Sequence, residues 1–321
     1  MATKVRGLLS AVLVLTAMWL VDCGHYTCGA TFGSGTCTSG GSGGVGQGGG
    51  GGNTIQNPAV FDFFFENGTL NAAFLNTSNN FSLIPNFTSP SLPLTGAGVG
   101  GMAVVQKKWL YIGLGPHVAG FSINVGTGAL TALAGSPFAS PSTEAYAITT
   151  DPAGQFLFLS AANDAQVVVF AINQTSGALT TVGTFATTGF AGGITTDGLG
   201  KYLYVTQANL GTEVTAFAIG TTGALTAVGG SPFAISIAQL KSEPTGQFLF
   251  GVTGNGANNG FPSDNHIYVF SIDQTTGVIT PGTGSPFATV FTPANVEVLP
   301  GGKFVFTFNQ TVTGTLSLIH I

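Results

Sequence analysis

Residues 117–139 read HVAGFSINVGTGALTALAGSPFA, and three later stretches repeat the same pattern. They are QVVVFAINQTSGALTTVGTFA at 166–186, EVTAFAIGTTGALTAVGGSPFA at 213–234 and HIYVFSIDQTTGVITPGTGSPFA at 266–288. Each copy is anchored by one phenylalanine, and successive anchors lie 49, 47 and 53 residues apart: Phe121, Phe170, Phe217 and Phe270. A period of this size indicates one structural unit that is repeated along the chain.

A second series of aromatic runs follows the same period. It consists of WLYI at 109, FLFL at 156, YLYV at 202, FLFG at 248 and FVFT at 304. Turn sequences rich in glycine, three of them with proline, precede four of these runs, at 151–154, 197–200, 243–246 and 300–302. Aromatic or β-branched runs between such turns are typical of β-strands, and no stretch has a helical periodicity long enough for a crossover helix.

Each repeat has room for four short strands. In one repeat we expect them at Glu144–Thr150, Gln155–Ser160, Gln166–Ile172 and Ala178–Gly183. Four strands in about 47 residues match the blade of a β-propeller, which is one four-stranded antiparallel sheet. The sequence therefore predicts an all-β fold, a β-propeller with blades at Val99–Leu133, Glu144–Gly183, Ala191–Val228 and Ser236–Pro281.

The cycle TGALT…GSPFA…DPxGQFLF, repeated across Val99–Phe308, resembles the seven-bladed β-propeller lactonase family, the 6-phosphogluconolactonase-like group and its relatives with YVTN repeats. The resemblance implies seven blades and the hydrolysis of lactones. Seven blades need on the order of 330 residues, whereas 269 remain from Asn53 onward. We expect about five and a half blades and a C-terminal truncation, because the first unit is degenerate and residues 317–321 do not continue the repeat.

The N-terminal residues have the pattern of an export signal. Lys4 and Arg6 precede an apolar run from Leu8 to Val21, which predicts a signal peptide over residues 1–22. An N-terminal anchor helix is the alternative. Cys23 closes the run as in a bacterial lipobox, although Asp22 stands where that pattern has a small residue. Lipidation of Cys23 and plain secretion both stay open, and either one predicts an extracytoplasmic protein that meets a membrane only through an anchor.

Residues 23–52 are predicted to form a flexible tether before the propeller domain at 53–321. The stretch SGGSGGVGQGGGGG at 39–52 has almost no side chains to bury. Cys28 and Cys37 lie within the tether and form either a disulfide or two free thiols, since an exported segment permits both.

Charge is scarce and excludes several functions. Charged residues make up 6% of the 321 residues, and the only cations after the leader are five lysines. A nucleic-acid binder needs many cationic contacts to phosphates, so this class is excluded. Arginine is the usual clamp for the phosphate or carboxylate groups that the resemblance implies in a lactonase substrate, and the domain has none. We therefore favour a non-catalytic propeller that binds a glycan, a peptide or an envelope protein without a cofactor; a lactone hydrolase is the alternative.

Ligands of propellers usually lie on the side where the inter-blade loops meet the loops between the second and third strands. Polar residues of these loops are candidate ligand contacts, or else solvated strand ends: His117, Glu144, Asn163, Asp164, Asn209, Glu213, Asp264 and His266. His117 and His266 are three blades apart and cannot share a metal ion at bond lengths of about 2 Å, so we expect no metal site.

The innermost strands carry a second set of candidates. Aligning the repeats places five residues at one position: Met102, Thr149, Thr195, Lys241 and Glu297. Two ionisable residues on adjacent blades form either a structural ion pair or a general acid and base, so Lys241 and Glu297 are weak catalytic candidates. We expect a direct or water-bridged ion pair between them. The preceding residues should pack between blades, because neighbours on a strand point to opposite faces: Ile148, Ile194, Leu240 and Val296.

Overall fold

The computed structural model describes residues 61–66, 69–75, 81–84, 87–90, 92, 99–207, 213–254, 264–290, 292–299, 301–309 and 316–320. Within these ranges the chain forms strands, turns and loops without a helix, so none of the described residues belongs to a helix that could span a membrane. The predicted signal peptide (residues 1–22) and tether (residues 23–52, with Cys23, Cys28 and Cys37) lie outside the described residues, as does Asn209.

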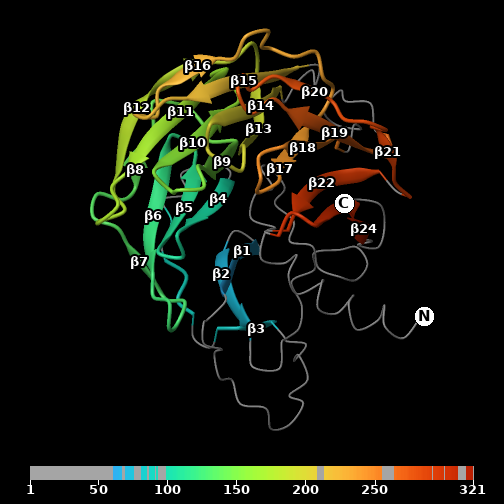
Figure 1. Cartoon of the computed structure of the whole chain (residues 1–321). Coiled ribbons are helices and arrows are strands. Elements are labelled where there is room, and N and C mark those ends of the chain that lie inside the picture. The colour runs from blue at the N-terminus through green and yellow to red at the C-terminus, as the bar shows by residue number, and fades with distance from the viewer. Residues whose placement is uncertain are drawn as a thin grey trace, which may run out of the picture.

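The described strands form six antiparallel sheets that follow one another along the chain (Figure 1), and we number them blades 1 to 6. Blade 1 holds β1 (Phe61–Glu66), β2 (Thr69–Leu75) and β3 (Phe81–Leu83). Blade 2 holds β4 (Val99–Val105), β5 (Trp109–Leu114), β6 (His117–Ile123), β7 (Leu130–Ala132) and β8 (Phe138–Ala139). Blade 3 holds β9 (Ala147–Thr150), β10 (Phe156–Ala161), β11 (Gln166–Ile172) and β12 (Leu179–Ala186).

The remaining three sheets continue the pattern. Blade 4 holds β13 (Ala191–Thr196), β14 (Tyr202–Gln207), β15 (Val214–Ile219) and β16 (Leu225–Ala227). Blade 5 holds β17 (Gln239–Ser242), β18 (Phe248–Val252), β19 (His266–Ile272), β20 (Ile279–Pro281) and β21 (Phe287–Ala288). Blade 6 holds β22 (Pro293–Val298), β23 (Phe304–Asn309) and β24 (Leu316–His320). The predicted all-β propeller of antiparallel blades is confirmed, while the total of seven blades stays a prediction.

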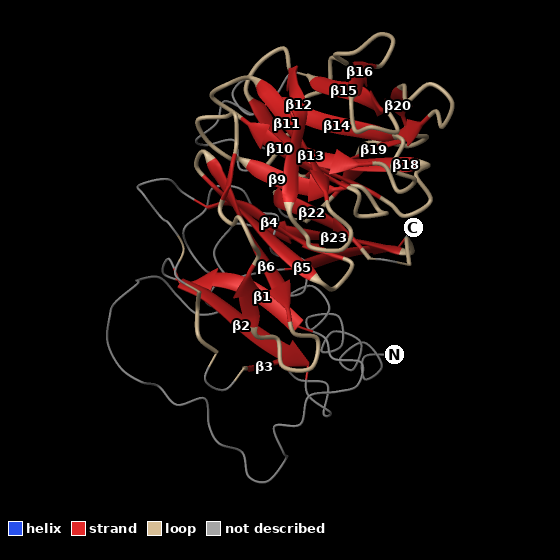
Figure 2. Ribbon diagram, turned by 90° about the vertical axis from the view of Figure 1, so that its left-hand side faces the viewer, coloured by secondary structure: helices blue, strands red, loops and turns tan. Residues whose placement is uncertain are grey.

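The blades are arranged around a common centre. The first strands of blades 2 to 6 contact one another in chain order, β4 with β9, β9 with β13, β13 with β17 and β17 with β22, and Figures 1 and 2 show the sheets fanning outward from them. Since the strands of a blade alternate in direction, the blade has two edges. We call the side of the turns between first and second strands the turn edge, and the opposite side the loop edge.

Apolar side chains fill the space between neighbouring blades. The four residues that precede the aligned inner position are buried there, as expected: Ile148, Ile194, Leu240 and Val296. The glycine of the repeat's TG motif, which follows a serine in blade 3, also lies between two blades. Gly177 of blade 3 has φ +72°, and a Cβ there would lie 2.6 Å from the indole nitrogen of Trp109 in blade 2. The Tyr111 hydroxyl donates a 2.6 Å hydrogen bond to the Gly177 carbonyl, so this turn joins the two blades.

The SPFA motif ends three of the blades, and after its proline the chain pairs a second time with the third strand. The strand prediction did not include this second pairing. In blade 2 the fourth strand stops at β7, and after Pro137 the chain returns as the short strand β8 beside the start of β6. Ser136 Oγ accepts a 2.9 Å hydrogen bond from the Gly120 N–H of β6. Blade 3 has the sequence TFA instead, and β12 there continues along β11 as one strand with a register shift at Val169 and Phe170, since no proline removes a backbone donor.

Candidate functional site

The innermost strands place most of the aligned residues at one level. Thr149 pairs with Phe158, Lys241 with Phe250 and Glu297 with Phe306, each opposite the third residue of an aromatic run. The alignment of Met102 with them is wrong. The turn from β4 to β5 is one residue shorter than the turn from β9 to β10, so Ala103, and not Met102, lies opposite the equivalent Tyr111.

Lys241 and Glu297 form the expected ion pair between blades 5 and 6. Lys241 Nζ lies 3.6 Å from Glu297 Oε1, and the side chains are 19% and 7% exposed. Hydroxyl groups join the neighbouring inner strands: Thr196 Oγ1 donates to the Thr150 carbonyl (3.1 Å), and Ser242 Oγ donates to the Thr196 carbonyl (2.7 Å). The pair thus belongs to a row of polar contacts that tie blades together, and its catalytic role stays a prediction.

The two edges of the propeller differ in charge. Lysines on the turn edge are matched by carboxylates of the same edge: Lys107, Lys108, Lys201 and Lys303 with Asp151, Asp197, Glu243 and Asp273. The loop edge carries carboxylates and no lysine or arginine among its described residues: Glu144, Asp164, Glu213 and Asp264. The loop edge is therefore the negative side of the molecule.

The carboxylates of blade 3 hold the loops that bear them. Asp164 accepts hydrogen bonds from the backbone N–H of Thr143 (2.6 Å) and from its hydroxyl (2.9 Å). Glu144 Oε1 accepts a 3.0 Å hydrogen bond from the Asn163 N–H. These bonds join the inter-blade loop to the loop between the second and third strands, so both carboxylates have a structural role.

Blade 4 has a similar arrangement around Glu213. Its Oε2 accepts 3.0 Å hydrogen bonds from the Thr188 hydroxyl and from Gln207 Nε2. Gln207 Nε2 also lies 2.8 Å from Thr188 Oγ1, which closes a triangle of side chains. Glu213 thereby fixes the inter-blade loop to the second strand, as the carboxylates do in blade 3.

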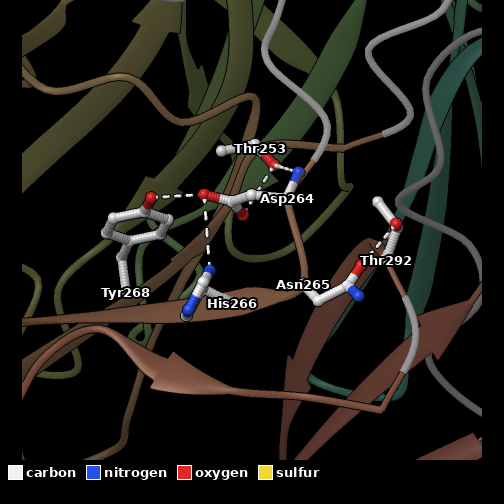
Figure 3. Close-up of polar contacts among 6 residues, drawn as sticks. All are labelled: Thr253, Asp264, Asn265, His266, Tyr268 and Thr292. Atoms are coloured by element: carbon white, nitrogen blue, oxygen red, sulfur yellow. Dashed lines mark hydrogen bonds and ion pairs between the residues drawn. The ribbon is translucent and has the colours of Figure 1, made fainter.

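Blade 5 is different, because its carboxylate lies beside a tyrosine and a histidine side chain (Figure 3). Asp264 Oδ2 accepts a 2.5 Å hydrogen bond from the Tyr268 hydroxyl and lies 3.7 Å from His266 Nδ1. Asp264 Oδ1 accepts a 3.2 Å hydrogen bond from the hydroxyl of buried Thr253. The hydrogen bond to Asp264, followed by burial, raises the pKa of Tyr268 to about 12. The phenol therefore remains a donor at neutral pH, and Asp264 carries the charge of the cluster.

A second pair of contacts extends this cluster toward blade 6. The Thr292 hydroxyl donates a 2.7 Å hydrogen bond to Asn265 Oδ1, and the Thr289 N–H donates a 2.6 Å bond to the Asn265 carbonyl. Four residues that take part in these contacts were not predicted from the sequence: Thr253, Asn265, Tyr268 and Thr292. Tyr268 follows His266 by two residues on β19, and strand alternation places both on one face. That spacing is the signal that could have identified it.

The remaining candidates do not gather into a site. His117 lies half-buried at the start of β6 in blade 2 and pairs with Ala139. Among the described residues, no group of three or more His, Cys, Asp or Glu side chains is placed to hold a metal ion. A pocket of about 200 Å³ lies at the turn edge between blades 3 and 4, lined in part by Asp151 and Gly200. Asp151 there accepts two N–H groups of its own turn, so its carboxylate has a structural role.

The fold and site can now be compared with known proteins. Residues 105–238 match the family described as "Lactonase, 7-bladed beta-propeller". These residues form part of a lactonase-like β-propeller. A putative 6-phosphogluconolactonase from Bacteroides fragilis is 20% identical, with 75% of this chain and 70% of that chain covered and a TM-score of 0.57. A second, from Bacteroides uniformis, is 16% identical, with 82% of each chain covered and a TM-score of 0.58.

A third similar structure is the periplasmic gluconolactonase of Pseudomonas aeruginosa. It is 15% identical, with 84% of each chain covered and a TM-score of 0.57. No curated protein sequence matches the chain. At these identities the lactonase-like propellers share the fold with this chain, and the likeness does not extend to an activity.

Proposed function

We propose that the chain is an exported, non-catalytic binding propeller of the cell envelope, with its loop edge as the binding surface. The observation that carries this proposal is the charge of that edge. Its carboxylates in blades 3 and 4 hydrogen-bond to their own loops, and no lysine or arginine lies among its described residues. An anionic substrate such as a phosphorylated lactone is repelled by such an edge, whereas a neutral or cationic partner is not. A glycan, a peptide or another envelope protein fits this requirement.

The N-terminal sequence supports the place of action. A cationic start, the apolar run Leu8–Val21 and the glycine-rich residues 39–52 suit export followed by display on a flexible tether. We propose that Cys23 carries lipid. Mass spectrometry of the mature protein, purified from its cells with detergent, should find a lipid mass on Cys23. An unmodified Cys23 at the N-terminus of the mature chain would instead indicate plain secretion.

Binding and turnover are measured together to test the main proposal. The full chain is titrated with neutral glycans, basic peptides and acidic peptides, and the same preparation is incubated with gluconolactone and 6-phosphogluconolactone. We expect saturable binding without turnover, weakened by His266→Ala on the loop edge and kept by Asp273→Asn on the turn edge. Turnover of a lactone without saturable binding of any of these partners would overturn the proposal.

One observation favours a second function, the hydrolysis of an uncharged lactone. His266 lies beside Asp264, and an imidazole held by a carboxylate can act as a general base. His266 Nε2 would take a proton from water while the water oxygen adds to the lactone carbonyl; the ring C–O bond then breaks and its oxygen receives the proton. Gluconolactone hydrolysis by the wild type, reduced at least tenfold by His266→Gln, would support this function. Equal rates in both proteins would exclude it.

A further inference from the structure

The blade 5 cluster, made of Thr253, Asp264, His266 and Tyr268, fixes the orientation of an exposed imidazole. His266 Nδ1 is buried, has no hydrogen-bond partner, and faces Asp264 Oδ2 at 3.7 Å. This distance is too long for a hydrogen bond, but a lone pair on Nδ1 would face the lone pairs of a carboxylate. The neutral imidazole therefore carries its proton on Nδ1, and Nε2 is left as an acceptor.

The acceptor nitrogen lies on the exposed side of the ring. The side chain of His266 is 39% exposed although Nδ1 is buried, so the exposed part lies on the Nε2 side of the ring. Figure 3 shows that nitrogen pointing away from Asp264. The ring lies at the start of β19, where the backbone of His266 pairs with Ala288. A ligand that reaches this part of the loop edge meets an acceptor.

The charge behind this acceptor is not balanced inside the cluster. The hydrogen-bond donors to Asp264 are the hydroxyls of Thr253 and Tyr268, both neutral. They order the carboxylate without cancelling its charge, and Tyr268 keeps its proton at neutral pH because its pKa is about 12. A donor bound at Nε2 lies across the imidazole ring from Asp264, so the carboxylate acts on it at longer range and favours a donor that carries a positive charge. A hydroxyl group supplies only the donor, whereas a primary ammonium group supplies both the donor and the charge.

We propose that the blade 5 cluster binds a primary ammonium group, which donates a hydrogen bond to His266 Nε2 and is attracted by Asp264. The group can come from an amino sugar or from a lysine side chain, which share this chemistry. The inference rests on the proposed binding function and specifies its ligand. In blade 3 the corresponding carboxylate, Asp164, is bonded to a loop, and in blade 4 the position of His266 is taken by Glu213, so neither blade repeats this arrangement.

Matched pairs of small molecules test the charge requirement on the full chain. Glucosamine is compared with N-acetylglucosamine, and Nα-acetyl-lysine amide with Nα-acetyl-glutamine amide, by calorimetry at low salt. At least one amine should bind ten times more tightly or better than its neutral partner. The stronger amine then identifies an amino sugar or a lysine side chain as the source. Equal binding of amines and neutral partners would overturn the inference; if a neutral glycan binds the loop edge in that case, the proposed binding function still holds.

Substitutions then locate the binding. Asp264→Asn should weaken amine binding at least tenfold, because the side chain keeps its size and loses its charge, and His266→Phe should do the same by removing Nε2. Asp273→Asn, which removes one charge from the turn edge, should leave the affinity unchanged. An equal loss in all three variants would indicate general attraction to a negative protein and would overturn the site. Nitrogen chemical shifts of His266 in the folded wild type should also show the Nδ1–H form; a dominant Nε2–H form would contradict the geometry.

Discussion

Asp164 in blade 3 and Asp264 in blade 5 both lie two residues before the third strand of their blades, yet they have different partners. Asp164 bonds to the backbone and hydroxyl of Thr143 in the inter-blade loop. Asp264 bonds to Tyr268 and lies beside His266. The third strand explains the difference, since blade 3 has Gln166 and Val168 where blade 5 has His266 and Tyr268. The repeat therefore fixes where a carboxylate lies, and the strand beside it decides whether that carboxylate holds a loop or orients a reactive side chain.

Asp62 in blade 1 is a third carboxylate to compare, and one of its oxygens has no hydrogen-bond partner. Its replacement is expected to change the stability of the protein more than any other substitution considered. Asp62 is 7% exposed, and the oxygen without a partner is Oδ1. Phe61 lies against Gly128 as Phe156 lies against Gly223, so β1 is the counterpart of the strands that carry the aromatic runs. The position of Asp62 holds leucine in four other blades: Leu110, Leu157, Leu203 and Leu249. Burial raises the pKa of Asp62 to about 7 from 3.8. In the unfolded chain Asp62 ionises near pH 4, whereas in the folded chain it stays protonated up to about pH 7. The free energy of unfolding therefore falls as the pH rises from 4 to 7.

We therefore expect Asp62→Leu to stabilise the protein by about 4 kcal/mol above pH 7 and by much less near pH 4. Denaturant unfolding of both proteins between pH 4 and 8 measures this difference. Asp62→Asn is the control of equal size. It should remove the fall in stability with rising pH but keep a buried polar group that lacks a hydrogen-bond partner. A constant difference between wild type and Asp62→Leu across this range would contradict the raised pKa.

The ion pair between Lys241 and Glu297 gives the next largest effect, because each charge has the other as a counter-charge. Lys241→Met or Glu297→Gln alone should lower the free energy of unfolding by about 2 to 3 kcal/mol, since a partly buried charge loses its partner. The double variant should lose less than the sum of the two, and a double-mutant cycle measures this coupling. Additive losses would mean that the two charges do not stabilise each other.

Much of the fold was predictable because the repeat encodes it locally. Aromatic runs and Gly/Pro turns located β10 and β11 of blade 3 to within a residue. The position of Met102 was missed because the turn from β4 to β5 is one residue shorter than the turn from β9 to β10, while the aromatic runs at 109 and 156 keep the spacing of the repeat. For the site, sequence placed Asp164 and Asp264 on the same edge. Their different partners depend on side-chain orientation in space, which the repeat spacing does not contain.

The comparison predicts a moderate loss of stability when the loop contact of blade 3 is removed. Asp164→Asn loses the charge that accepts the Thr143 N–H and hydroxyl, so the free energy of unfolding should fall by about 1 to 2 kcal/mol. Asp264→Asn should cost less, because Asp264 accepts from two hydroxyl groups, which can turn to other acceptors, whereas the backbone N–H that Asp164 accepts is fixed. Thermal unfolding of the two variants at pH 7 ranks them. A larger loss in Asp264→Asn would show that the blade 5 carboxylate is the more important structural contact.

The smallest expected effect on stability gives the most specific test of the blade 5 cluster, the titration of Tyr268. Its pKa of about 12 has the Asp264 hydrogen bond as its largest cause, so Asp264→Asn should move it toward 10. The hydrogen bond acts on the protonated phenol, so the stability that it contributes is present at neutral pH and is lost as the pH rises from 10 to 12. NMR of ring-labelled tyrosine follows each phenol separately. Tyr111 is the internal control: burial raises its pKa and its hydroxyl bonds to the Gly177 carbonyl, so it should not change. An unchanged Tyr268 pKa in Asp264→Asn would mean that burial, and not the hydrogen bond, raises it. Asp264 would then have only a structural role, as Asp164 has in blade 3.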